Sequence, residues 1–235
     1  MKQFTAYPGL PGLIRFLLTL FACQHLSAQN AISFHFSNVL KMDPADQAGA
    51  ILWVGNWNNV GNVQAKTPLI VNSLVDKDGK PVAGMTFIAV GGSSMSGNTT
   101  DGKVTGTKND TRLFASYFDQ DQGPETIIIV TGIPFARYDV YFYRHDDGDK
   151  RAGKFKVGDT ALYVGGGAGN PLDDGRGYVR SSDTEPNNVA GFTAGNYVRF
   201  EKLSGPTLHA TFSAVNAGDS TQRSKVVGFQ IVERK

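Results

Sequence analysis

Cysteine is nearly absent from the sequence, which has one cysteine, Cys23, among 235 residues. A single cysteine excludes an intrachain disulfide framework and a cysteine-rich zinc site. An excess of one charge is also lacking, because 23 Lys and Arg residues face 21 Asp and Glu residues, a net charge of +2. Since a nucleic-acid-binding domain needs a strongly basic face, this balance argues against nucleic acid as a partner.

Long hydrophobic runs are absent as well, although hydrophobic residues make up 40% of the chain and aromatic residues 11%. These shares are too high for a disordered chain, so the sequence predicts a soluble globular protein. Spanning a bilayer takes about 20 consecutive apolar residues. No transmembrane segment is therefore expected.

Residues 1–28 have the order of zones that is typical of a secretory signal. Two basic residues, Lys2 and Arg15, precede an apolar run, and the small residue Ala28 comes at the end. We therefore expect a signal peptide over 1–28 and a secreted or periplasmic protein. Removing these two bases from 23 leaves 21 against 21 acids, so the mature chain would carry no net charge.

A lipid anchor is the alternative reading of the same segment. The tetrapeptide Leu20-Phe21-Ala22-Cys23 resembles the box that precedes a lipidated cysteine in bacterial lipoproteins. Phe21 departs from that pattern, which prefers a small or β-branched residue there. We therefore favour cleavage after Ala28 over lipidation at Cys23.

Beyond residue 30, apolar and polar residues alternate with a period of two, which indicates half-buried strands. The apolar sets expected to share a face are Ile32, Phe34 and Phe36; Tyr138, Val140 and Phe142; Leu208, Ala210 and Phe212; and Val227, Phe229 and Ile231. The continuously apolar segment Ile127–Val130 predicts a central strand that is covered on both faces.

Turn signals such as Asp78-Gly79 and Gly205-Pro206 separate these segments at short intervals, and turns account for the 28 glycines. No helical stripe extends over three turns, although Arg112 to Phe118 fits either one helical turn or a strand. The sequence predicts an all-β protein, an antiparallel β-sandwich of the jelly-roll type with roughly ten strands. Residues 29–235 would form this single domain.

The order of the strand segments resembles that of galactose-binding-like jelly rolls, the group that contains malectin-like and carbohydrate-binding modules. The segments that carry the resemblance are the opening strand, Tyr138-Asp139-Val140-Tyr141-Phe142, Asn196-Tyr197-Val198-Arg199-Phe200 and Gly228-Phe229-Gln230-Ile231. Trp57-Asn58-Asn59 also looks like part of secreted β-sandwich domains of environmental bacteria. The resemblance implies binding of a sugar or glycan, often beside a structural calcium ion, and it carries over no catalytic residue.

Trp57 is the first candidate for a sugar contact. An aromatic ring can cover the apolar face of a sugar while polar groups bond its hydroxyls. Trp57 lies in the Gly/Asn-rich segment 55–59, so we expect a loop-borne ring platform with Asn58 and Asn59 beside it. The alternative is that Trp57 seals the edge of the sandwich. Trp53 follows apolar residues and is the weaker candidate.

A second candidate group begins where a strand is expected to end, a usual place for functional residues. Its residues are Tyr143, Arg144, His145 and Asp146. The alternative is a solvated hairpin turn whose charges pair with Lys150 and Arg151. His35 and His209 are expected on the outward faces of their strands, as exposed or edge residues.

The acidic residues suggest calcium as a possible structural metal. No cofactor is expected to be required. The segment 119–123 alternates acids, but glycine falls at its fifth position rather than its sixth, and Val130 stands at position twelve, which rejects an EF-hand. A calcium site assembled from separate loops would take its ligands from Asp119, Asp121, Asp146 and Asp173.

Enzyme motifs are mostly lacking, with no nucleophile elbow, no His-Glu-x-x-His and no phosphate loop. An acid pair such as Asp119 with Asp146 would suit glycoside hydrolysis if their carboxyl groups lay about 5–10 Å apart. The leading hypothesis is an exported, non-catalytic module that binds a polysaccharide or glycan. The alternatives are a structural or adhesive cell-surface module with protein partners, and a glycan-active hydrolase or lyase.

Overall fold

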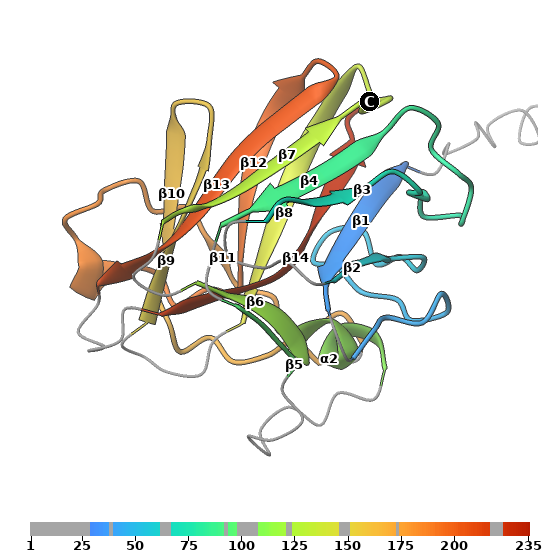
Figure 1. The fold of residues 1–235 in the computed structure, drawn as a ribbon. Helices are drawn as coiled ribbons and strands as arrows, with labels where there is room; N and C mark the ends of the chain where they lie inside the picture. The colour runs from blue at the N-terminus through green and yellow to red at the C-terminus, as the bar shows by residue number, and fades with distance from the viewer. Residues whose placement is uncertain are drawn as a thin grey trace, which may run out of the picture.

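Two β-sheets pack face to face in the computed structural model of the chain (Figure 1). The structure describes residues 29–37, 40–61, 67–91, 94–97, 108–120, 124–145, 151–172, 174–216 and 223–235. The predicted β-sandwich is confirmed. The proposed signal peptide, including Cys23, lies outside the described residues.

The larger sheet has eight strands, and most pairs of adjacent strands in it are antiparallel. Its main path runs through β11 (Arg180–Ser181), β12 (Tyr197–Ser204), β8 (Arg137–His145), β14 (Ser224–Glu233), β1 (Ala31–Phe36) and β2 (Asn58–Val60). A branch continues from β14 to β6 (Ser116–Gln120) and then to β5 (Ser94–Gly97). The pairs β1–β2 and β11–β12 are parallel.

The smaller sheet has six strands, all paired in the antiparallel sense. Their order is β10 (Thr160–Val164), β9 (Arg151–Val157), β13 (Thr207–Asn216), β7 (Thr126–Thr131), β4 (Thr86–Val90) and β3 (Leu69–Val71). The two sheets hold more strands than expected because β2, β3 and β11 span only two or three residues. Strands that short carry no detectable alternation.

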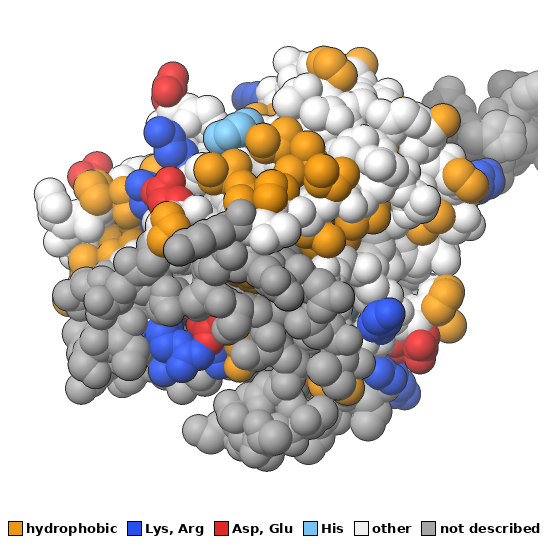
Figure 2. Space-filling view, viewed as in Figure 1, with side chains coloured by type: hydrophobic (Ala, Val, Ile, Leu, Met, Phe, Trp, Pro, Cys, Tyr) orange, Lys and Arg blue, Asp and Glu red, His pale blue; other side chains and the backbone are white. Residues whose placement is uncertain are grey.

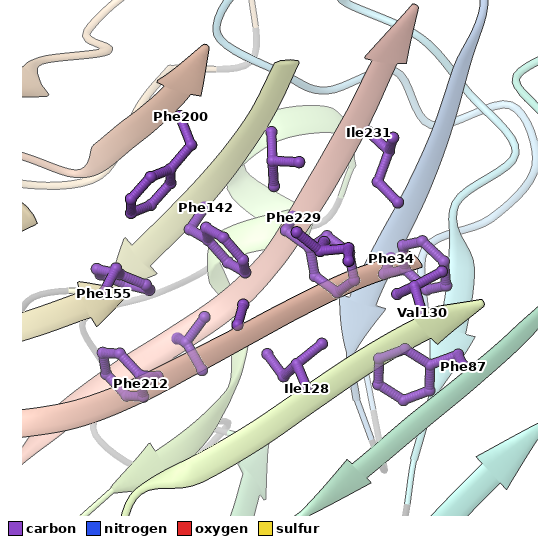
Figure 3. Packing of buried hydrophobic residues seen from close by; sticks show 14 of the residues in the cluster. Phe34, Phe87, Ile128, Val130, Phe142, Phe155, Phe200, Phe212, Phe229 and Ile231 are labelled. Carbon is purple, nitrogen blue, oxygen red and sulfur yellow. The ribbon is translucent and has the colours of Figure 1, made fainter. Parts of the chain in front are cut away.

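Phenylalanine rings dominate the core between the sheets (Figure 3). The rings of Phe34 and Phe229 stack with centroids 4.4 Å apart, and those of Phe155 and Phe212 lie 4.6 Å apart. The inward faces predicted for β1, β8 and β13 are confirmed, because all their members belong to this core.

The face predicted for β14 is wrong at one position. Phe229 and Ile231 lie in the core between the sheets, but Val227 packs on the opposite face of the larger sheet and Val226 takes the inward position. The register shifts between Val226 and Gly228, as in a β-bulge. An extra residue in one strand breaks the period of two, so the alternation changes sign there.

Strand β7 also differs from the expectation that both of its faces are covered. Its burial alternates strictly, with Ile128 and Val130 in the core and Ile127 and Ile129 only partly buried. No described element covers the outer face of the six-stranded sheet. The apolar run therefore belongs to a central strand with one open face.

The segment Arg112 to Phe118, which fits either a helical turn or a strand, contains the end of a helix and the start of a strand. Helix α2 (Asn109–Phe114) is followed directly by β6. A 3-10 turn, η1 (Val189–Gly191), is the other helical piece among the described residues. None of the helices described is long and apolar enough to cross a membrane.

A second apolar cluster lies on the outer face of the eight-stranded sheet, beneath α2 and the segments 40–57 and 170–180. Its buried members include Trp57, Leu113, Phe114, Tyr143 and Tyr197.

Candidate ligand-binding site

Trp57 is buried, so the expectation of an exposed platform at this residue is wrong. Only 4% of the residue is exposed, and its ring packs against Tyr143 with centroids 6.0 Å apart. Its indole Nε1 donates to the carbonyl oxygen of Val54 at 2.9 Å. The next residue begins β2, which runs beside β1 and holds the ring on the outer face of the larger sheet.

Asn58 and Asn59 use their side chains to bind the backbone rather than a ligand. Asn58 Nδ2 donates to the carbonyl oxygens of Ser33 and Val75, and its Oδ1 accepts from Val75 N. Asn59 binds both backbone groups of Met42. Their amides therefore join segments of the fold.

Tyr143 lies in β8, which extends to His145, so it is a strand residue rather than part of a turn. It is fully buried, and burial raises its pKa well above the usual value. Its hydroxyl donates to Gln230 Oε1 at 2.5 Å and accepts from Ala50 N at 3.1 Å. The structure thus brings Tyr143 and Trp57 together, but within the buried cluster.

Arg144 and His145 are buried as well, with 1% and 3% exposed. Arg144 donates hydrogen bonds to three oxygens, Ser224 Oγ, Gly165 O and Arg151 O. His145 Nδ1 lies 3.0 Å from Asn170 Oδ1, and its ring stacks on Tyr117. Asp146 lies outside the described residues.

Of the four proposed calcium ligands, the structure describes only Asp119. This carboxylate is buried and forms an ion pair with Arg223, whose guanidinium would compete with a cation. Asp121, Asp146 and Asp173 lie outside the described residues. Within the described part of the chain, no three His, Cys, Asp or Glu residues could hold a metal ion. A calcium site stays a prediction.

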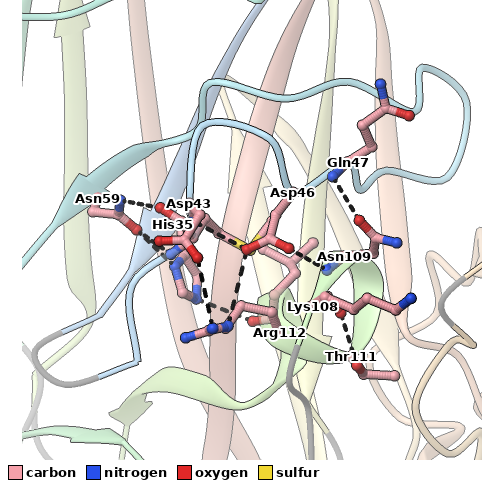
Figure 4. Close-up of polar contacts among 11 residues, drawn as sticks. His35, Asp43, Asp46, Gln47, Asn59, Lys108, Asn109, Thr111 and Arg112 are labelled. Carbon is pink, nitrogen blue, oxygen red and sulfur yellow. Dashed lines mark hydrogen bonds and ion pairs between the residues drawn. The ribbon is translucent and has the colours of Figure 1, made fainter.

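His35 is buried on a strand between β14 and β2, which corrects the expectation of an exposed or edge residue, whereas His209 is exposed as expected. The Nδ1 of His35 lies 3.1 Å from Asn59 Oδ1, and the Nε2 of His35 lies 3.1 Å from the carbonyl oxygen of Leu113 in α2 (Figure 4). Burial lowers the pKa of His35 to about 4. The outward face of β1 is covered because α2 and the segment 40–48 pack on it.

The start of α2 is bound to the segment 40–48 (Figure 4). Asp46 Oδ1 accepts from Asn109 N at 2.8 Å, and Gln47 N donates to Asn109 Oδ1 at 3.0 Å. Arg112 Nε lies 3.9 Å from Asp46 Oδ2. These contacts fix the first turn of α2, which carries Asp110.

Asp110 joins two distant segments beneath the surface. Its carboxylate has no exposed area, and it accepts from four donors: Gly49 N, Tyr178 OH, Trp53 Nε1 and Gly175 N, at 2.5–3.0 Å. Burial raises the pKa of Asp110, and the hydrogen bonds oppose this shift. The carboxylate thereby holds segments 49–53 and 175–178 together.

Trp53 is 40% exposed, so the exposed ring is the weaker candidate of the sequence analysis and not Trp57. Its Nε1 donates to Asp110 Oδ2 at 3.0 Å, which fixes the orientation of the indole. A Cβ at Gly175 would lie 3.9 Å from Trp53 Cδ1, so the turn at Gly175 passes close to the ring. Trp53 is thus an exposed ring in a fixed position.

Exposed aliphatic side chains lie in the segments joined by Asp110 and in the turn that passes close to this ring. We define the Trp53 patch as Ile51, Trp53, Leu172 and Val179, which are 53%, 40%, 52% and 39% exposed. They come from the two segments that meet at Asp110 and the turn beside it. Among the described residues the fifth large exposed hydrophobic residue, Ile70, lies on β3 of the other sheet.

Two opposite charges flank Gly175 on the turn that contacts Trp53. The turn is closed by Leu172 N, which donates to Arg176 O at 2.9 Å. Arg176 Nε forms an ion pair with Asp174 Oδ2 at 2.6 Å. Their side chains are 75% and 48% exposed. The patch therefore combines a fixed ring with a donor and an acceptor for hydrogen bonds.

Local sequence gives no signal for this site. Trp53 follows Ile51 and Leu52, which read as core, whereas Trp57 lies among glycines and amides, which read as a loop. The exposed indole of Trp53 is held by a carboxylate in α2, far away in the sequence.

Other surfaces are less suited to a sugar. Hydrophobic side chains gather on the outer face of the six-stranded sheet (Figure 2), where Ile70, Ile88, Ile129 and His209 lie in register. A cavity of about 160 Å³ lies on this face, and one of about 400 Å³ lies at the end of the sandwich near Phe135 and Glu233. Neither is lined by an exposed aromatic ring.

Comparison of the chain with protein-family models, with curated proteins and with solved structures found no match. The resemblance to galactose-binding-like jelly rolls accordingly stays a prediction.

Proposed function

We propose that the chain is an exported, non-catalytic module that binds a polysaccharide or glycan through the Trp53 patch. One observation carries this proposal: Trp53 is exposed, and a buried carboxylate holds its indole in place. A ring that is already fixed loses little conformational freedom when a ligand binds.

The patch offers both kinds of contact that sugar recognition uses. The face of Trp53 covers apolar C–H groups, while Asp174 accepts and Arg176 donates hydrogen bonds to hydroxyls. This mode of binding requires no cofactor. Export follows from the signal-like order of residues 1–28.

Binding to a panel of plant, algal and bacterial polysaccharides tests the proposal. Trp53→Ala should weaken binding roughly 10- to 30-fold, because loss of a central aromatic contact costs about 2 kcal/mol. Trp57→Phe is the matched control, since it changes the buried tryptophan and should leave affinity unchanged. Wild-type protein that binds no polysaccharide, or a Trp53→Ala variant that binds as well as wild type, would contradict the proposal.

The same panel separates the alternatives. The module with protein partners is favoured by the apolar outer face of the six-stranded sheet, and it replaces the first proposal if no polysaccharide binds. Release of reducing ends from a polysaccharide, abolished by an acid-to-alanine change, would establish the glycan-active hydrolase or lyase.

A further inference from the structure

The composition of the Trp53 patch points to a class of glycan, and this inference rests on the proposed function. We propose that the ligand is an N-acetylated, uncharged glycan, such as a polymer of N-acetylhexosamine. The observation that supports it is that the patch combines the exposed ring with aliphatic side chains and with the ion pair of Asp174 and Arg176.

Ile51 and Leu172 are each about half exposed, at 53% and 52%. A sugar that bears only hydroxyls would press some of them against these side chains, where they would lose water and gain no partner. An acetamido group places a methyl there instead. Burial of that methyl against Ile51 or Leu172 is favourable.

The polar groups of an acetamide also match the charged pair on the turn. The ion pair with Asp174 uses Arg176 Nε, so the terminal nitrogens of the guanidinium can donate to the acetamide carbonyl. The carboxylate of Asp174 can accept from the acetamide N–H or from a hydroxyl.

The same pair argues for an uncharged ligand. Asp174 lies 2.6 Å from Arg176 and cancels its charge at the edge of the patch. A uronate or sulfate would have to displace this carboxylate or lie beside it, and like charges repel. Uronic and sulfated glycans are therefore disfavoured.

Titration of the full-length protein with chitohexaose and with cellohexaose tests the inference, because the two differ only in the acetamido group at C2. One buried methyl contributes about fourfold in affinity, so two sugars on the patch should give roughly 15-fold tighter binding of chitohexaose. Equal or tighter binding of cellohexaose, or of another unacetylated or anionic glycan, would overturn the inference and leave the proposed function standing. Absence of binding to every glycan would overturn both.

Variants of the aliphatic residues give a second readout. Leu172→Ser and Ile51→Ser should reduce the ratio of the affinities for chitohexaose and cellohexaose toward one. Ile70→Ser is the matched control, since Ile70 is equally exposed on the other sheet. Variants that weaken both ligands equally would show that these side chains do not recognise the acetyl group.

Discussion

Asp110 is the residue on which the proposed site depends most. Its two carboxylate oxygens accept from four donors, two in each of the segments that carry the Trp53 patch. An ionised carboxylate offers acceptors only, which matches this set of donors. Each of these hydrogen bonds to the carboxylate is charge-assisted, and together they offset the cost of burying its charge.

We expect Asp110→Asn to lower the free energy of unfolding by about 3 kcal/mol, because its amide group faces two donors and leaves them unpaired. Urea denaturation measures this loss. Asp174→Asn, which changes an exposed carboxylate near the same patch, serves as the control and should leave the midpoint almost unchanged. Equal midpoints for the two variants would show that Asp110 does not clamp the segments.

His35 makes the stability depend on pH. Its folded pKa of about 4 lies below the usual 6.5, so the unfolded chain binds a proton more readily. Its contribution is complete above pH 6.5 and is lost as the pH falls toward 4, by about 3 kcal/mol in all. Denaturation midpoints across this range measure the effect.

The histidine variants isolate that contribution. His35→Gln should remove this part of the pH dependence, whereas His209→Gln, at an exposed position, should keep it. A wild-type protein whose stability rises as the pH falls from 6.5 to 4, relative to His35→Gln, would reverse the assigned direction.

Among the elements, β14 decides which side chains face each cluster. Its bulge transfers Val227 to the outer cluster and keeps Phe229 and Ile231 in the core. Gly228 follows the bulge where β14 passes close to β1. A Cβ there would overlap the carbonyl oxygen of Phe34, so only glycine fits.

Gly228→Ala should therefore lower the free energy of unfolding by about 3 kcal/mol, because backbone atoms have to move. Gly205→Ala is the comparison: φ is +89° there, and a Cβ would meet nothing within 4 Å. That change should cost about 1 kcal/mol from backbone conformation alone. Similar unfolding midpoints for the two variants would contradict the steric role of Gly228.

At the scale of the whole molecule, alternation within strands predicts the sandwich because each inward face is a local property. Ile32, Phe34 and Phe36 show their shared face in the sequence itself. The bulge in β14 could not be anticipated, because one extra residue is visible only from its pairing with β8. Local patterns therefore predict layers better than register.

The candidate site depends on contacts between distant segments, and local patterns therefore do not indicate that Trp53, rather than Trp57, is the exposed tryptophan. Trp57 is buried against Tyr143 in the outer cluster of the larger sheet, and the exposed indole of Trp53 is held by Asp110 of α2. Neither contact leaves a pattern near the tryptophans. The residue types that suit a sugar contact are visible in the sequence, but which of them are exposed is decided by the fold.

The most direct test of the proposed binding site uses the fluorescence of the protein's only two tryptophans. In the Trp57→Phe variant all tryptophan emission comes from Trp53. Titration with chitohexaose should shift that emission to shorter wavelength and protect it from acrylamide, with an affinity equal to that of wild type. In the Trp53→Phe variant, the emission of buried Trp57 should stay unchanged. A response from Trp57 and none from Trp53 would contradict the assignment of the binding ring.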